Sequence, residues 1–316
     1  MSRPADQPQA STGGRSGRIL IVGRSGRLAR DLIEAAARRD VAVTALGRPD
    51  LDITDKGSIA RALGATAPRA VVNVAGQVLV DEAERDPASA FAINCTAAGS
   101  LAAAAAQAGL PLLHLSSDYV FDGAKMAPYT EEDAAAPLSA YGRSKAAGEA
   151  AVQAAHPGAI VVRTSWVYGP HGTNFLTTML RLAETQDTVR VVADQHGTPT
   201  AGSDLAEALL AIVDRVVESG TGRHAGIYHV AGSGETTWRG FAEAVFAGWK
   251  RRGHRVPKVA PISLADWAGP AARPRDSRLD CRKVARDFGI TRPDWRESLE
   301  RCLDRLAGLA KPLNSE

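Results

Sequence analysis

The segment RILIVGRSGRLA, at residues 18–29, decides how the first half of the chain folds. Its apolar residues from Ile19 to Val22 are typical of a short strand that is buried on both faces of a parallel sheet. Glycines follow at positions 23 and 26, and an alanine-rich pattern with helical spacing continues to about Arg39. A strand, a glycine turn and a helix in this order match the context of a dinucleotide-binding fingerprint, although any strand-to-helix turn can use glycine.

The glycine turn would place particular residues against a bound dinucleotide. Gly23 permits the tight turn, and Gly26 lets backbone amides approach a pyrophosphate at the N-terminus of the helix. Ala29 is small enough to replace the third glycine of the fingerprint. We therefore expect the cofactor to contact Gly23, Gly26, Arg27 and Leu28.

The end of the second predicted strand, residues 41–46, bears on the choice of dinucleotide. Gly47 and Arg48 follow it, where an acidic residue would bond the ribose 2′-hydroxyl and repel a 2′-phosphate. The guanidinium of Arg48 would attract that phosphate, which favours NADPH, with NADH as the alternative. An exposed loop arginine explains Arg48 equally well. Asp52 and Ile53 come next and are expected near the adenine.

Strands and helices continue to alternate along the chain. A third strand is predicted over residues 70–75, where the small residues Ala75 and Gly76 would let the backbone close over the cofactor. A long helix over 87–109, a strand over 112–117, a helix over 139–155 and a strand over 159–168 follow. This alternation predicts an α/β fold, a Rossmann-type doubly wound parallel sheet with helices on both faces.

The chain is expected to divide into three regions. Residues 1–17 are rich in Ser, Gly, Gln and Pro without a hydrophobic segment, which predicts a disordered tail and not a signal peptide. Residues 18–170 would form the dinucleotide-binding domain. Residues 171–310 are less regular and would mainly form a smaller α+β substrate lobe, with some segments returning to the first domain.

Three polar side chains with complementary chemistry lie in the middle of the chain. Ser117 ends the apolar strand 112–117, where a hydroxyl would point into the crevice beyond the sheet. Tyr141 and Lys145 are four residues apart on a predicted helix and therefore share one face. A phenol beside an ammonium can protonate a carbonyl oxygen while an alcohol holds that oxygen, which suits hydride addition. Tyr and Lys also occur at this spacing by chance, so the context decides.

Composition excludes several classes of protein. A length of 316 residues with 45% hydrophobic residues supports a substantial core, and a net charge of +3 argues against nucleic acid as a partner. The three cysteines, Cys95, Cys281 and Cys302, are far apart and lack metal-ligand spacing, which predicts a reduced, cytoplasmic protein. We expect no membrane partner, because no apolar run of membrane length stands out.

The motifs together resemble the dTDP-4-dehydrorhamnose reductase family of the extended short-chain dehydrogenase/reductase superfamily, from about Arg18 to Leu306. The Tyr141–Lys145 helix is shared with the whole superfamily, whereas the strings around Asp118 and Trp166 are specific to reductases of deoxysugar nucleotides. The other matching stretches are Gly23–Gly26, Val80–Glu84, Ser117–Gly123, Arg163–Tyr168, Asn174–Phe175, Thr178–Leu180, Asp194–Gln195 with Gly197 and Pro199–Thr200, and Arg273–Pro274 with Ser277 and Leu279.

The resemblance implies that a nicotinamide cofactor reduces the C4 ketone of dTDP-4-dehydro-β-L-rhamnose to dTDP-L-rhamnose. By matched position, Tyr141 is the proton donor, Lys145 supports it and binds the nicotinamide ribose, and Ser117 polarises the ketone where the family usually has Thr. Asp118, Tyr119 and Trp166 would contact the hexose together with Ser117. A homodimer is the expected assembly.

The chain departs from the family pattern in two places. Val78 replaces a usual Thr, which leaves another dTDP-4-keto-6-deoxyhexose as an alternative substrate. Some members hold Mg²⁺ with acidic residues, but the matching positions here are Asp31, Ser203 and Arg296, so we expect no metal, and an Asp31–Arg296 ion pair is a substitute. A non-catalytic NADP-binding regulatory subunit is the alternative of another class.

Overall fold

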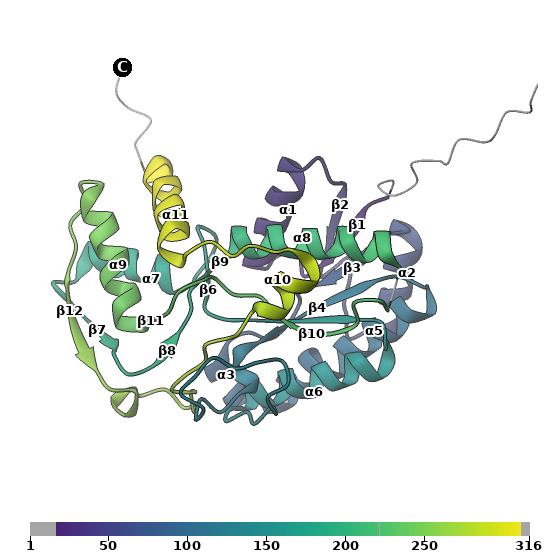
Figure 1. Ribbon diagram of the computed structural model, residues 1–316, viewed down its shortest axis with the longest axis horizontal. Helices are drawn as coiled ribbons and strands as arrows, with labels where there is room; N and C mark the ends of the chain where they lie inside the picture. Colours follow the sequence, from purple (N-terminus) through teal and green to yellow (C-terminus); the bar gives the residue numbers. More distant parts are fainter. Residues whose placement is uncertain (1–16, 221, 311–316) are drawn as a thin grey trace, which may run out of the picture.

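The computed structural model describes residues 17–220 and 222–310, so the predicted tail lies outside the described residues apart from Gly17. Figure 1 shows a parallel sheet between two layers of helices, with a second group of elements beside it that includes the last helix. The sheet has six strands in the order β10-β5-β4-β3-β1-β2. Its strands are β1 (Ile19–Val22), β2 (Val43–Leu46), β3 (Ala70–Asn73), β4 (Leu112–Ser117), β5 (Ile160–Thr164) and β10 (Gly226–His229).

All pairs of neighbouring strands in this sheet run parallel, as the alternating pattern predicts. In this order β1 lies between β2 and β3, and Ile19 is paired with Val43 on one side and with Ala70 on the other. The chain crosses to the other side after β3, and β4 then lies between β3 and β5. Ligands of such sheets bind beyond the carboxyl ends of the strands near the point where the strand order reverses.

The two faces of the sheet bury alternate residues of the same strands. Ile19 and Ile21 pack with α1 (Arg27–Arg38) and α8 (Gly202–Ser219) on one face. Leu20 and Val22 pack on the other face, which is covered by α2 (Lys56–Thr66), α5 (Ala98–Gln107) and α6 (Ala140–Ala155). A strand buried on both sides needs apolar residues at every position, which explains the unbroken run at 19–22.

The helix predicted over residues 87–109 is not one regular α-helix. It consists of α4 (Pro87–Phe91), a π-helical segment η1 (Ala92–Ala97) and α5. The π segment directs the buried Asn94 side chain to the Gln77 backbone and to Ser144 on α6, at 2.9–3.0 Å. By length and composition the stretch from Pro87 to Gln107 would suffice to cross a membrane, so the chain does contain an apolar run of that length. Here α5 packs against α6 and α2.

The second half of the chain contributes to both parts of the molecule. α8 and β10 return to the main sheet, and α10 (Arg282–Phe288) packs on β10. A separate core is formed by α7 (Phe175–Thr185), β7 (Thr188–Val192), α9 (Trp238–Arg251), β12 (Lys258–Ile262) and α11 (Trp295–Ala310). The short elements are α3 (Val80–Arg85), η2 (Asp118–Val120), β6 (Val167–Tyr168), β8 (His196–Gly197), β9 (Thr200–Ala201), β11 (Thr236–Thr237) and η3 (Leu264–Asp266).

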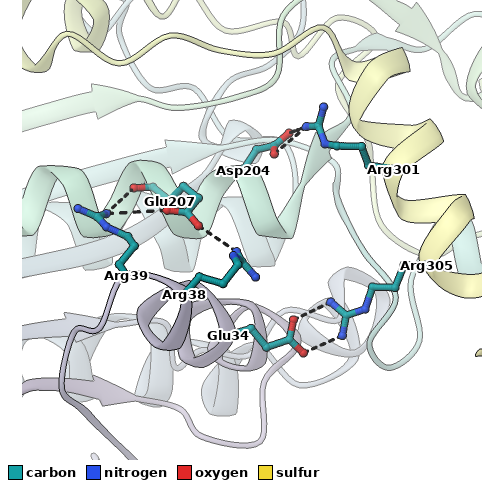
Figure 2. A network of polar contacts seen from close by, with 7 residues as sticks. All are labelled: Glu34, Arg38, Arg39, Asp204, Glu207, Arg301 and Arg305. Carbon is teal, nitrogen blue, oxygen red and sulfur yellow. Dashed lines mark hydrogen bonds and ion pairs between the residues drawn. The ribbon is translucent and has the colours of Figure 1, made fainter.

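Ion pairs join the last helix of this second core to the main domain. Arg305 on α11 contacts both carboxylate oxygens of Glu34 on α1 at 2.6 and 2.7 Å, and Arg301 contacts Asp204 on α8 (Figure 2). The side chains are partly exposed, so each pair contributes only about 0–1 kcal/mol to folding. Together these pairs attach α11 to α1 and to the first turn of α8.

Candidate active site

A pocket of about 550 Å³ opens at the carboxyl ends of the strands of the main sheet. Residues from the loops after β1, β2, β3, β4 and β5 line it, together with α6 and one residue of α9. The structure brings nearly all of the predicted site residues to this pocket: Gly23, Gly26, Arg27, Leu28, Arg48, Asp52, Ile53, Ala75, Gly76, Ser117, Asp118, Tyr119, Tyr141 and Trp166. Lys145 lies behind the wall that these residues form, with its ammonium on the backbone of β4.

The glycine turn after β1 has the shape that a dinucleotide requires. Gly23 has a φ of 111°, in the region that favours glycine, and a Cβ there would lie 2.9 Å from the Ala75 amide nitrogen. The Gly26 amide donates to the Gly23 carbonyl at 2.9 Å, and α1 begins at the next residue. The free amides of the first turn of α1 therefore face the pocket, where a phosphate is stabilised. These residues fit a dinucleotide.

A second arginine, which was not predicted from the sequence, lies against the loop after β2. Arg24 forms an ion pair with Asp50 and donates to the Arg48 carbonyl at 3.1 Å. Its side chain also lies against Gly47, since a Cβ on that glycine would be 3.3 Å from Arg24. Arg24 thus lies against the loop that carries Arg48, and of the two arginines Arg48 lines the pocket. Only the folded loop reveals this, because Arg24 belongs to the turn after a different strand.

The three catalytic candidates meet where α6 approaches the end of β4. Ser139 caps α6 by accepting from the Gly142 amide at 3.1 Å, and the helix then carries Tyr141 and Lys145 on one face. Gly142 allows the close approach, because a Cβ there would lie 2.1 Å from the Tyr119 carbonyl oxygen. The Lys145 ammonium donates to the Leu115 carbonyl at 2.6 Å. The Ser117 hydroxyl is beside the Tyr141 phenol.

Burial shifts the pKa values of these groups. It raises the pKa of the Tyr141 phenol above its usual range, so this phenol is protonated at neutral pH. Burial lowers the pKa of Lys145 to about 8, against an opposing effect of the Glu149 carboxylate. Burial also raises the pKa of Asp118 to about 7. The site therefore holds a neutral phenol ready to donate and an ammonium that would stabilise the phenolate left behind.

A buried ion pair lies next to Lys145, one turn further along α6. Glu149, one helical turn further along α6, accepts two bonds from the Arg163 guanidinium on β5 at 2.9 and 2.6 Å. Ser116 on β4 donates to the same carboxylate at 2.5 Å. Both charged side chains are at most 5% exposed, so the pair is shielded from solvent. It ties α6 to β4 and β5 at the level of Lys145.

The sugar side of the pocket contains a pair of stacked indoles. Trp166 lies between β5 and β6 with a φ of 46°, which breaks the single strand predicted over residues 159–168. Its ring stacks on Trp238, with ring centroids 3.5 Å apart, and Trp238 also lines the pocket. Gly197 also lies against the Trp166 ring, because a Cβ there would be 2.4 Å from it. Trp238 was not predicted from the sequence, because it begins α9 in the second half of the chain and carries no local signal.

The basic loop at residues 273–279 reaches the rim of the pocket. Arg273 contacts both carboxylate oxygens of Asp81 at 3.0 and 3.1 Å and donates to the Tyr119 hydroxyl at 3.3 Å. Val78, the position that departs from the family pattern, is 51% exposed and lines the pocket mouth. A different side chain at position 78 would therefore contact a bound ligand and not the core.

The region around Asp31 differs from the expected ion pair. Arg296 pairs with Asp294 at 3.7 Å and lies over the Trp295 ring, so no Asp31–Arg296 bridge forms in the described structure. Asp31 is buried against the start of α8, and burial raises its pKa to about 6. It lies near Glu34 and His171, and its ligand atom is within 4.8 Å of theirs. However, Arg305 already occupies Glu34 with two hydrogen bonds.

Comparisons with known proteins agree with this geometry. The family model of the RmlD substrate binding domain matches residues 17–307. A dTDP-4-dehydrorhamnose reductase from Sinorhizobium fredii is 46% identical over 284 residues, which cover 90% of this chain and 96% of the relative. A dTDP-4-keto-6-deoxy-D-glucose reductase from Streptomyces niveus is 39% identical and covers 87% of this chain and 92% of its own length.

A solved structure is similar over the same extent. The dTDP-4-dehydrorhamnose reductase of Bacillus anthracis, in complex with NADP, superimposes with a TM-score of 0.83 at 32% identity and covers 92% of this chain and 99% of that one. The match spans both the dinucleotide pocket and the second core, so the likeness is not confined to the common nucleotide-binding fold. The chain belongs to the RmlD family of dTDP-4-dehydrorhamnose reductases.

Proposed function

We propose that the protein uses NADPH to reduce the C4 ketone of dTDP-4-dehydro-β-L-rhamnose to dTDP-L-rhamnose. The observation that carries the proposal is the meeting of Ser117, Tyr141 and Lys145 at a pocket whose other end is a glycine turn and a helix N-terminus. The NADP complex of the Bacillus anthracis relative supports the choice of cofactor. The bound nicotinamide would supply the hydride.

The residues of this chain would manage the charge that the reduction creates. Gly23, Gly26 and the first turn of α1 would hold the pyrophosphate, while Arg24 and Arg48 would bind the 2′-phosphate. Negative charge that develops on the ketone oxygen would be met by the Ser117 hydroxyl and neutralised by the proton of Tyr141. Lys145 would stabilise the resulting phenolate.

The sugar would lie between the catalytic residues and the indole pair. The proposed contacts come from Asp118 and Tyr119 after β4 and from Trp166 after β5, all of which line the pocket. An apolar ring face suits the carbon face of a deoxyhexose, and the buried hydroxyl and carboxyl groups suit its hydroxyls. We further propose that the enzyme works in the cytoplasm, since Cys95, Cys281 and Cys302 are all free thiols.

A second candidate function is reduction of another dTDP-4-keto-6-deoxyhexose. Two observations support this second function: the similarity to the Streptomyces niveus reductase, and the exposed Val78 at the pocket mouth. A non-catalytic regulatory subunit would have no need for Ser117, Tyr141 and Lys145 in this arrangement. The chemistry of the site therefore favours an enzyme under either substrate.

The test is turnover of the purified protein with NADPH and dTDP-4-dehydrorhamnose, followed through the loss of NADPH absorbance. The product sugar is identified by NMR, which distinguishes rhamnose from its C4 epimer. Tyr141→Phe protein serves as the matched control for contaminating reductases. Turnover that requires Tyr141 and yields dTDP-L-rhamnose supports the proposal, and a different product sugar supports the second candidate. No turnover with any 4-ketosugar would reject both.

A further inference from the structure

The hydrogen bonds of Ser117 conflict with its proposed role. The Ser117 hydroxyl lies 3.0 Å from the Asp118 Oδ1 atom, to which it donates, and its oxygen accepts from the Tyr119 amide at 3.2 Å. A hydroxyl has one proton to donate and two lone pairs to accept with. While Asp118 is ionised it can only accept, so it takes the single proton that Ser117 needs for the ketone oxygen.

Asp118 lies where an ionised carboxylate is unfavourable. It is 2% exposed, and its Oδ2 atom has no hydrogen-bond partner in the described part of the chain. The groups that face it carry no charge. They are the hydroxyls and phenols of Ser117 on β4, Ser277 in the basic loop, Tyr119 on its own segment and Tyr141 on α6, together with the backbone amides of Asp118 and Tyr119.

The nearby cations are committed elsewhere. Arg273 bonds Asp81 and the Tyr119 hydroxyl, and the Lys145 ammonium bonds a backbone carbonyl. Among the residues that the structure describes, no salt bridge reaches Asp118. Burying a charge without a partner is costly, and the group then stays neutral instead. The raised pKa of Asp118, about 7, agrees with this account.

We propose that Asp118 acts as a neutral acid that turns the Ser117 hydroxyl toward the substrate ketone. A protonated Asp118 donates to one lone pair of Ser117, the Tyr119 amide donates to the other, and the Ser117 proton is released to the ketone oxygen. Asp118 keeps its own proton throughout, because Tyr141 provides the proton that the product alcohol gains. Asp118 is thus a positioning residue that acts through Ser117, and this role rests on the proposed function.

The charge that develops during reduction favours the same protonation state. Negative charge grows on the ketone oxygen as the hydride arrives, and Ser117 is the contact between that oxygen and Asp118. An ionised Asp118, separated from the ketone oxygen by Ser117 alone, would repel this negative charge, and the repulsion is strong because the site is buried. A neutral carboxyl that donates along the chain of hydroxyls strengthens the hydrogen bond to the oxygen instead.

The first test compares pH profiles of kcat/KM for the ketosugar at saturating NADPH. In the wild type, the active acid form of Asp118 is present below pH 7 and lost as the pH rises through it. This loss alone lowers activity about tenfold between pH 6 and 8, and the loss of the Lys145 ammonium brings the fall to about twentyfold. In the Asp118→Asn variant, the side-chain amide donates at every pH. Its activity should therefore fall only about twofold between pH 6 and 8, because Lys145 loses its proton over part of this range. Asp118→Ala, which cannot donate, should be about 10²-fold slower throughout.

Asp122 provides a matched control in the same segment. Its carboxylate accepts from the Tyr129 hydroxyl at 2.7 Å and from the Ala124 amide at 3.0 Å, and these bonds lower its pKa. It stays ionised over the tested range, so Asp122→Asn should keep the wild-type profile. Identical pH profiles for wild type and Asp118→Asn would overturn the proposal.

Two further measurements separate this role from a direct contact between Asp118 and the sugar. In a Ser117→Ala background there is no hydroxyl to turn, so adding Asp118→Asn should no longer change the pH profile; a change that persists there would reject action through Ser117. In ¹³C-aspartate NMR spectra of the holoenzyme, the Asp118 carboxyl should titrate near pH 7. Titration below about pH 5 would overturn the proposal even if the proposed substrate proves wrong, whereas a wild type without ketosugar turnover would reject only the proposed function.

Discussion

Trp238, at the start of α9, lies flat on Trp166, with ring planes 6° apart. The two residues are far apart in the sequence, and Trp238 packs against the second core, so this stack is where the second core meets the pocket. Phe175 packs against the outer side of Trp238 at 4.5 Å between ring centroids. Trp166 adopts a left-handed backbone conformation that a bulky residue rarely occupies, and contacts of its ring with Trp238 and Gly197 hold it there.

Replacing Trp238 with Leu should raise KM for the ketosugar about two- to tenfold and leave the Kd for NADPH unchanged. The substitution removes an aromatic stack that is worth about 0.5–1.5 kcal/mol, and the Trp166 ring is then free to move. Steady-state kinetics and cofactor titration measure the two effects. Trp249→Leu on the same helix is the control, because Trp249 stacks on His254 and does not line the pocket. An unchanged KM in Trp238→Leu would show that Trp166 holds its position alone.

Tyr141→Phe should lower kcat by about 10²- to 10⁴-fold while NADPH still binds, because the variant lacks the general acid. Single-turnover rates and NADPH fluorescence separate the two properties. Tyr168→Phe removes another buried hydroxyl, one that bonds the Trp295 carbonyl at 3.2 Å and faces away from the pocket, and should keep turnover. Near-normal turnover in Tyr141→Phe would exclude Tyr141 as the acid.

Ser117→Ala should cost about 10²-fold or more in kcat, since it removes the donor to the charged oxygen. Ser117→Thr keeps the hydroxyl, and a β-branched residue suits the end of strand β4, so it should stay active. Both variants are compared by kcat at a pH below 7. The prediction would be wrong if the alanine and threonine variants were equally impaired.

NADPH should be preferred over NADH, and Arg48→Ala should reduce that preference, because a guanidinium that binds the 2′-phosphate is lost. Arg24→Ala should act in the same direction, since it also leaves Asp50 unpaired beside the phosphate. The measurement is the ratio of kcat/KM for the two cofactors. Arg61→Ala, which removes an exposed arginine paired with Asp55, is the control. A wild type that prefers NADH, or a ratio unchanged by Arg48→Ala, would make Arg48 a surface residue only.

Activity should need no divalent metal. Mg²⁺ requires hard oxygen ligands in near-octahedral geometry, but Arg305 holds both oxygens of Glu34 beside Asp31. Protein treated with EDTA should keep full turnover, and its association state should not respond to added Mg²⁺. Loss of turnover on chelation, restored by Mg²⁺, would show that Asp31 and its neighbours do bind a metal.

The local sequence determined the parts of the protein that depend on short-range geometry. The apolar run at residues 19–22 could only be a strand buried on both faces, and the glycines at 23 and 26 specify the turn that follows it. The spacing of Tyr141 and Lys145 places them on one helical face wherever that helix packs. The alternation of strands and helices along the chain predicted a parallel α/β sheet, and the structure confirms it.

Tertiary structure decided whatever depends on contacts between distant segments. The approach of Arg24 to Arg48, the stack of Trp238 on Trp166 and the ion pair of Glu34 with Arg305 each join residues with no shared local pattern. Periodicity also missed the π-helical segment before α5 and the break at Trp166, because buried packing there overrides the preference of each residue for a regular helix or strand. Only the fold could place Asp118 in a buried site among uncharged groups, because burial depends on every segment that covers it.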